Sequence, residues 1–110
     1  MSIMMSESLR DIVSIGQLTG DQSEAIVFID DEAHHLELHS FTRDAQTLRC
    51  LVFAPRELIS QALVAKNMSA TVKFDNNPVG SGKIVAIGYE PVVIGNVSHD
   101  MLMLHMKRDN

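Results

Sequence analysis

The chain has 110 residues, which is enough for one domain with a buried core and too few for two. It carries 14 Asp and Glu against 9 Lys and Arg, a formal net charge of −5, and its basic residues are scattered singly apart from Lys107-Arg108. Nucleic-acid binders concentrate Lys and Arg on one face, so we expect no nucleic acid as a partner. No apolar run approaches the ~20 residues of a membrane-spanning helix, so we expect no membrane span.

Cys50 is the only cysteine, which excludes an internal disulfide and a CxxC motif and is typical of a reducing compartment. The first residues lack a basic segment followed by an apolar one, as a secretory signal would have. We therefore expect a cytoplasmic protein with a single β-rich domain over residues 1–110, in which residues 1–5 form a flexible tail.

The first half of the chain predicts one helix and three strands. Residues 6–15 place Leu9, Ile12 and Val13 on one apolar stripe, which is typical of a short helix. Residues 24–30 form an apolar run between acids, which favours a strand buried on both faces. Residues 34–41 alternate with a period of two, and residues 47–53 continue as a third strand. Short turns between these strands predict an antiparallel meander.

The second half begins with the most clearly marked helix. Pro55 suits its first position, and the helix is expected to run to residue 66. Its expected buried stripe consists of Leu58, Ile59, Ala62 and Leu63. Residues 70–75 and 83–89 then predict a β-hairpin, with an irregular Gly-rich loop over residues 76–82. A short strand at 92–97, a turn at 98–100 and an apolar strand at 101–106 complete the chain.

This order of elements predicts a mainly β (α+β) fold. We expect a small antiparallel, strongly curved sheet or a partly open β-barrel of about six to seven strands. One helix caps the barrel, and a short helix precedes it.

Three side chains on the strand at 34–41 are candidate metal ligands. Leu36 and Leu38 would face the core, which leaves His35, Glu37 and His39 together on the other face. Two imidazoles and a carboxylate are a ligand set for a divalent ion such as Zn²⁺, and His99 or His105 would supply a fourth ligand. The alternative is that these residues form only the solvated side of an amphipathic strand.

Other motifs with possible chemistry fail on spacing. Gly80-Ser81-Gly82-Lys83 resembles part of a phosphate-binding loop, but the full pattern would need Gly at position 77 and Ser or Thr at 84, where Asn77 and Ile84 stand. Cys50 lies in an apolar strand, which favours a buried structural thiol. No serine lies in a nucleophile elbow. We therefore expect no cofactor, apart from the candidate metal, and no catalytic residues outside that constellation.

Methionines gather at the two ends of the chain. Met101, Met103 and Met106 lie in a segment that is apolar on both faces, so one face would meet the core and the other a protein partner or a second subunit. The alternative is that the predicted helix at 6–15 covers this second face.

Two families share features with the sequence. Residues 70–94 resemble the C-terminal half of the surface-presentation (SpoA) domains of flagellar-switch and type III secretion proteins, and this resemblance implies an assembly role. Its matching positions are Val72, Phe74, Val79, Gly82, Ile84, Val85, Val93 and Ile94. A small β-barrel also resembles PilZ-type cyclic-dinucleotide receptors, but the paired arginines and the serine-containing turn of that family are both missing: Arg43 and Arg49 are six positions apart.

These observations favour a non-catalytic protein-binding or adaptor domain, expected to be homo-oligomeric. The second hypothesis is a metal-dependent enzyme or metal sensor that uses His35, Glu37 and His39. A third is a regulatory barrel with a small ligand in its interior.

Overall fold

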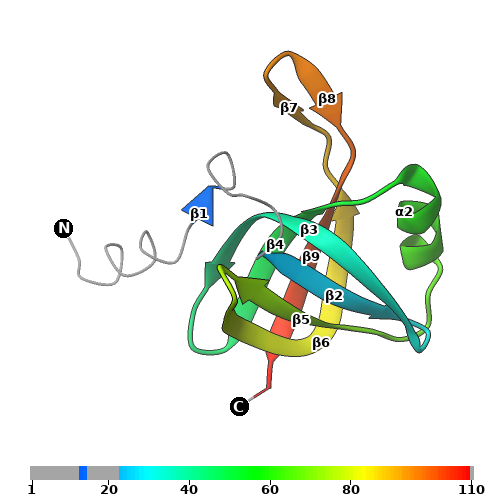
Figure 1. Cartoon of the computed structure of the whole chain (residues 1–110). Helices are drawn as coiled ribbons and strands as arrows, with labels where there is room; N and C mark the ends of the chain where they lie inside the picture. Colours follow the sequence, from blue (N-terminus) through cyan, green and yellow to red (C-terminus); the bar gives the residue numbers. More distant parts are fainter. Residues whose placement is uncertain (1–12, 15–22, 110) are drawn as a thin grey trace.

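The structure is a computed structural model, and it describes residues 13–14 and 23–109 (Figure 1). Its elements, in chain order, are β1 (Val13–Ser14), β2 (Glu24–Ile29), β3 (Glu32–Arg43), β4 (Thr47–Phe53), α2 (Arg56–Leu63), β5 (Met68–Phe74), β6 (Asn77–Tyr89), β7 (Val92–Ile94), β8 (Val97–His99) and β9 (Met101–Arg108).

Six of these strands form a closed antiparallel barrel. They are hydrogen-bonded in the order β3-β2-β5-β6-β9-β4, and β4 pairs with β3 to close the ring. Every pairing is antiparallel, as the short connections predict. The predicted mainly β class is confirmed, and the barrel is closed.

Strand alternation fills the interior of the barrel. The core cluster takes these buried side chains from the six strands: Ala25, Val27, Ile29, Leu36, Leu38, Phe41, Leu48, Cys50, Val52, Ala70, Val72, Val79, Ile84, Leu102, Leu104 and Met106. The prediction that residues 24–30 are buried on both faces is wrong, because Phe28 in β2 is 40% exposed. A barrel strand has one interior face, and the other faces outward.

Two-residue turns connect three pairs of strands. Asp30-Asp31, Asp75-Asn76 and Gly95-Asn96 all have positive φ, as the tight turns that match the strand twist require. The predicted irregular loop at 76–82 is therefore wrong, because β6 begins at Asn77. The predicted single strand at 92–97 is also wrong, because Gly95-Asn96 divides it into the β7–β8 hairpin.

Gly82, within the segment that resembles a phosphate loop, brings two strands into close contact. A Cβ atom at this position would lie 1.9 Å from the carbonyl oxygen of Lys107 in β9. Only glycine allows β6 and β9 to approach in this way. The glycine therefore serves strand packing, and the motif lies within a strand.

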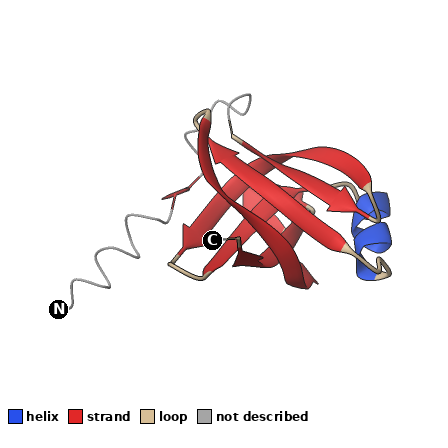
Figure 2. Cartoon of the chain, turned by 90° about the horizontal axis from the view of Figure 1, so that it is seen from below, coloured by secondary structure: helices blue, strands red, loops and turns tan. Residues whose placement is uncertain are grey.

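Helix α2 lies at one end of the barrel, near the ends of β2 and β4 (Figures 1 and 2). Leu58, Ile59 and Ala62 join the core, as predicted. Leu63, however, is 58% exposed, because the helix ends there and not at residue 66. The Asp30 carboxylate accepts hydrogen bonds from the backbone N–H groups of Lys66 and Asn67 and so fixes the chain between α2 and β5.

The predicted helix at 6–15 coincides with the described residues only at Val13–Ser14, and there it is wrong. This segment is β1, which pairs with Ser40 and Phe41 of β3. β1 lies on the same edge of β3 as β2, farther along the strand. Residues 6–12 and 15, and the predicted tail at 1–5, lie outside the described residues. None of the helices described is long and apolar enough to cross a membrane.

Candidate functional site

The three predicted metal ligands do not converge. His35 is exposed, and its Nδ1 lies 3.1 Å from Oε1 of Glu24 on the neighbouring strand. Glu37 is exposed farther along β3. Within residues 13–14 and 23–109, no three His, Cys, Asp or Glu side chains gather as a metal site.

A β-bulge explains why His39 leaves the predicted row. The register between β3 and β4 shifts between Leu38 and Ser40, so the alternation of β3 changes at His39. The His39 ring instead packs edge-on against Phe53, with ring centroids 5.7 Å apart. Burial and the nearby charge of His99 lower the pKa of His39. His105 lies on β9, where its Nδ1 is 3.4 Å from a guanidinium nitrogen of Arg49 on the neighbouring strand β4.

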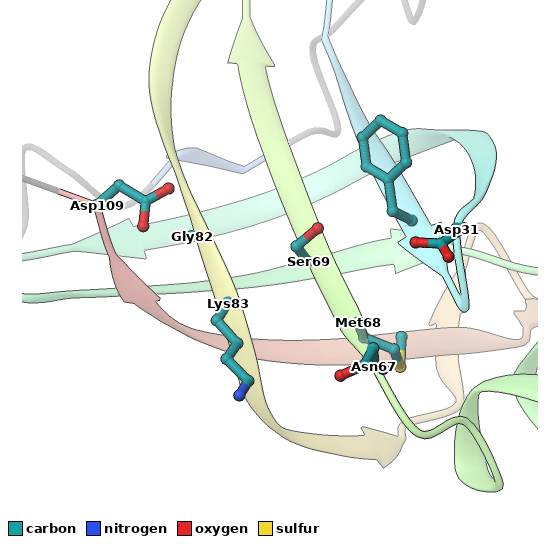
Figure 3. Close-up of a pocket in the computed structure, with 8 residues that line it drawn as sticks. Asp31, Asn67, Met68, Ser69, Gly82, Lys83 and Asp109 are labelled. Carbon is teal, nitrogen blue, oxygen red and sulfur yellow. The ribbon is translucent and has the colours of Figure 1, made fainter.

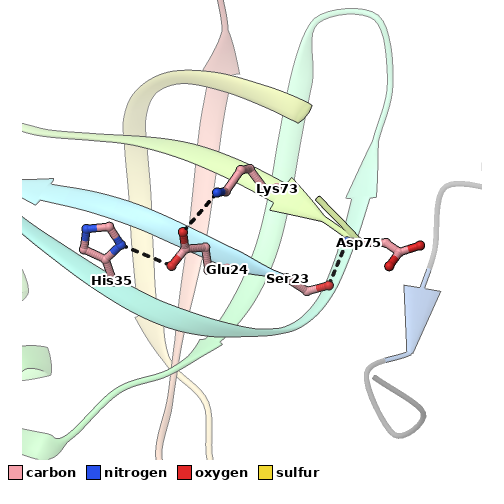
Figure 4. A network of polar contacts seen from close by, with 5 residues as sticks. All are labelled: Ser23, Glu24, His35, Lys73 and Asp75. Atoms are coloured by element: carbon pink, nitrogen blue, oxygen red, sulfur yellow. Dashed lines mark hydrogen bonds and ion pairs between the residues drawn. The ribbon is translucent and has the colours of Figure 1, made fainter. Parts of the chain in front are cut away.

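Glu24 is the centre of a polar network on the outer side of β2, β3 and β5 (Figure 4). Glu24 contacts His35 at 3.1 Å and Lys73 at 3.4 Å. Burial raises the pKa of Glu24, but the bonds and charges of His35 and Lys73 outweigh it, and the net shift is downward. The buried Ser23 hydroxyl accepts a hydrogen bond from the backbone N–H of Asp75, which ties the residue before β2 to the turn between β5 and β6.

The barrel interior is packed with side chains. Cys50 is 1% exposed within it, and burial raises the pKa of its thiol to about 12. A thiol with this pKa is neutral at physiological pH and a poor nucleophile. The prediction of a buried cysteine is confirmed.

A hollow lies on the outside of the barrel, across β2, β5 and β6 (Figure 3). Its volume is about 410 Å³. Phe28 and Met68 are its large apolar side chains, and the charged Asp31, Lys83 and Asp109 lie around them. Asn67, Ser69 and Gly82 complete the lining. The name "β2–β5 hollow" refers to these eight residues below.

The β7–β8 hairpin projects from the barrel beyond β6 and β9 (Figure 1). Val93 is 69% exposed and Val97 is 56% exposed, and Val92 and Ile94 are partly exposed. Four apolar side chains on the eight-residue hairpin, residues 92–99, therefore remain accessible. Projecting apolar side chains of this kind are typical of a surface that another molecule covers.

Polar bonds hold the base of the hairpin. The Tyr89 hydroxyl donates to Asp100 at 2.7 Å, and Nε of Arg56 donates to the same carboxylate at 3.2 Å. These bonds lower the pKa of Asp100, the Tyr89 bond foremost. The clamp joins the end of β6, the start of α2 and the residue before β9, so it sets the direction in which the hairpin leaves the barrel.

An aromatic contact joins the hairpin to the barrel wall. The ring of His99 in β8 packs edge-on against Phe53 at the end of β4, 5.4 Å between centroids. Val92 lies opposite His99 in the hairpin, and Val97 lies two positions before it, so all three share one hairpin face.

The same apolar surface continues down the barrel. Leu51 of β4 and Met103 of β9 are cross-strand partners at outward positions, and both are partly buried. Gly88 of β6 flanks Met103 and leaves room for its methyl group. We call this surface the hairpin face; it consists of Leu51, Phe53 and Met103 on the barrel and Val92, Ile94 and Val97 on the hairpin.

The predicted partner-binding methionines divide between two environments. Met103 lies on the hairpin face. Met106 points into the core and Met101 is also fully buried, so neither side chain is accessible. Their strand, β9, lies between β4 and β6 and has no free edge.

The sequence did not predict the hairpin, and of the residues on the hairpin face it predicted only Met103 as a contact residue. The signal was present in Gly95-Asn96, two residues that tolerate positive φ between short apolar runs. Phe53, His99 and Leu51 carried no local signal, because they meet only through the closure of the barrel.

No family model, no curated protein and no solved structure matches this chain.

Proposed function

We propose that this chain is a self-associating protein-binding domain whose contact surface is the hairpin face. The observation that carries the proposal is the projecting hairpin, whose Val97 is 56% exposed on the hairpin face. Protein interfaces bury an apolar centre of this kind within a polar rim. The clamp at Asp100 and the ring contact at His99 fix the hairpin against the barrel, which reduces the entropy lost on binding.

Sedimentation velocity of the purified chain, from micromolar to millimolar concentration, tests the proposal. The wild type is expected to associate reversibly. The V97K variant is expected to remain monomeric, because a cation would enter an apolar contact. The Val97 side chain is exposed in the single chain, so the fold of the variant should be retained, which circular dichroism checks.

V64K is the matched control. Val64 is 81% exposed at the end of α2, away from the hairpin face, and its replacement should leave association unchanged. A wild-type chain that stays monomeric at every concentration would contradict the proposed function, as would equal association of V97K.

A further inference from the structure

The wall formed by β4, β6 and β9 carries cations and no acids. The three strands are neighbours, and none of them contains Asp or Glu, although the chain has 14 acidic residues. Lys107 of β9 lies directly opposite Lys83 of β6. His105, two positions earlier on β9, lies directly opposite Arg49 of β4, so these side chains share the outward face. We call this set the cationic strip: Arg49, Lys83, His105 and Lys107.

The positive charges of the cationic strip are not neutralised within the described part of the chain. Arg49, Lys83 and Lys107 are exposed, and among the described residues none of the three forms an ion pair with a carboxylate. Of the acids that border the wall, Asp44 already accepts three hydrogen bonds from the two residues at the start of β4 and before it. Asp109 lines the β2–β5 hollow together with Lys83 but forms no ion pair with it. Like charges directly opposite each other destabilise a sheet, so an anionic ligand would relieve the strip.

The surface changes from cationic to aliphatic along this wall. Leu51 lies two positions after Arg49 on β4, and its cross-strand partner on β9 is Met103. Both side chains continue the outward face of the cationic strip and are partly buried. A nucleic acid is anionic along its whole length, and the net charge of −5 on this chain opposes such a polyanion. A cationic end and an aliphatic end favour a protein segment with the matching division.

We propose that this wall binds a segment of a partner protein that is acidic at one end and aliphatic at the other. Carboxylates of the segment meet Arg49 and Lys107, and its aliphatic side chains pack on Leu51 and Met103. Complementary charge at one end fixes the direction in which the segment lies. The inference goes beyond self-association, because the cationic strip lies outside the hairpin face.

Fluorescence anisotropy with a labelled synthetic peptide tests the proposal. The glutamate probe has a run of glutamates followed by alternating valine and serine. One counterpart carries glutamine in place of every glutamate, and a second carries serine in place of every valine. The wild type is expected to bind the glutamate probe more tightly than either counterpart. Added salt is expected to weaken this binding, because the attraction between exposed charges is screened.

Single substitutions locate the site. R49Q and K107Q are each expected to lower the affinity for the glutamate probe roughly twofold to fivefold, because each removes one exposed ion pair with the peptide. K66Q is the matched control: Lys66 is exposed beyond the end of α2, and its replacement changes the net charge by the same amount. The three replaced side chains are exposed, so the fold should be retained, which circular dichroism checks.

The outcomes separate this inference from the proposed function. No binding of the glutamate probe, equal binding of its glutamine counterpart, or equal losses in K66Q and K107Q would overturn the cationic strip as the site. Equal binding of the counterpart without valine would overturn the aliphatic half of the proposal. An oligothymidylate that binds more tightly than the glutamate probe, and loses affinity in R49Q and K107Q, would identify a nucleic acid and overturn the protein segment. None of these results alters self-association, which sedimentation measures without any peptide.

Discussion

The two sides of this barrel have the same strand alternation and enclose one core, but they differ in whether their outward charged side chains form ion pairs. On β2, β3 and β5, Glu24 holds both His35 and Lys73, so charges are balanced within the wall. On the wall formed by β4, β6 and β9, Arg49 and Lys107 form no ion pair with a carboxylate among the described residues. The same wall carries the outward apolar side chains of Leu51 and Met103 below the hairpin.

The largest effect is expected at the seam between the two walls. Gly82 pairs with Ala70 of β5 on one side and Arg108 of β9 on the other. Gly82→Ala would place a Cβ against the Lys107 backbone, so we expect a loss of about 3 kcal/mol or more in the free energy of unfolding. Urea denaturation measures it. Gly88→Ala is the matched control, since its Cβ would have 3.6 Å to the Met103 methyl. Equal stability of the two variants would refute the close-approach account.

A smaller effect is expected within the balanced wall. Glu24→Gln removes both ion pairs, and exposed pairs of this kind contribute roughly 0.2–1 kcal/mol each. The pKa of Glu24 is lowered by folding, so its contribution is present above its unfolded pKa near 4.5 and is lost as pH falls through the lower folded value. Urea titrations at neutral and acidic pH should show a difference between wild type and variant only at neutral pH. Glu37→Gln, an exposed residue on the same wall, serves as the control.

The clamp below the hairpin should matter for local order more than for global stability. Tyr89→Phe removes the hydroxyl that donates to Asp100, and we expect weaker protection of the hairpin base. Hydrogen exchange at the amides of β7 and β8 would report faster opening, with the barrel amides unchanged. Unchanged hairpin exchange would mean that Asp100 does not hold the hairpin.

The smallest change in folding stability is expected from substitution of His39, and this change depends on pH. Folding lowers its pKa, because the ring is partly buried and lies near His99. The folded chain therefore binds fewer protons than the unfolded chain just below pH 6.5, so stability declines as pH falls through this range. Thermal melts from pH 7.5 to 5 should show the decline, and His39→Gln should flatten it. An equally steep decline in the variant would assign the effect to other groups.

Local patterns predicted the strands and helix well, because each depends on neighbouring residues. Leu36 and Leu38 alternate inward as expected, and Pro55 precedes a helix that buries Leu58 and Ile59. The errors arose where the period of two breaks. The bulge at His39 changes the face of every later β3 residue, and no sequence signal marks it.

The candidate contact surface was largely hidden from the sequence for a different reason. It is assembled from β4, β9 and the hairpin, and only closure of the barrel brings them together. Met103 was predicted from composition, but Met101 and Met106 have the same chemistry and are buried. Composition can suggest that a strand has excess apolar surface, yet it cannot say which side chains the fold covers.

The central proposal is that the chain associates with a second copy through the hairpin face. Two-dimensional amide NMR spectra of the wild type over a concentration series test it most directly, because each residue reports its own environment. The account predicts that signals of Leu51, Val97 and Met103 shift together as concentration rises, while those of Val64 and its neighbours stay fixed. Spectra that do not change, or changes confined to residues outside the hairpin face, would contradict it.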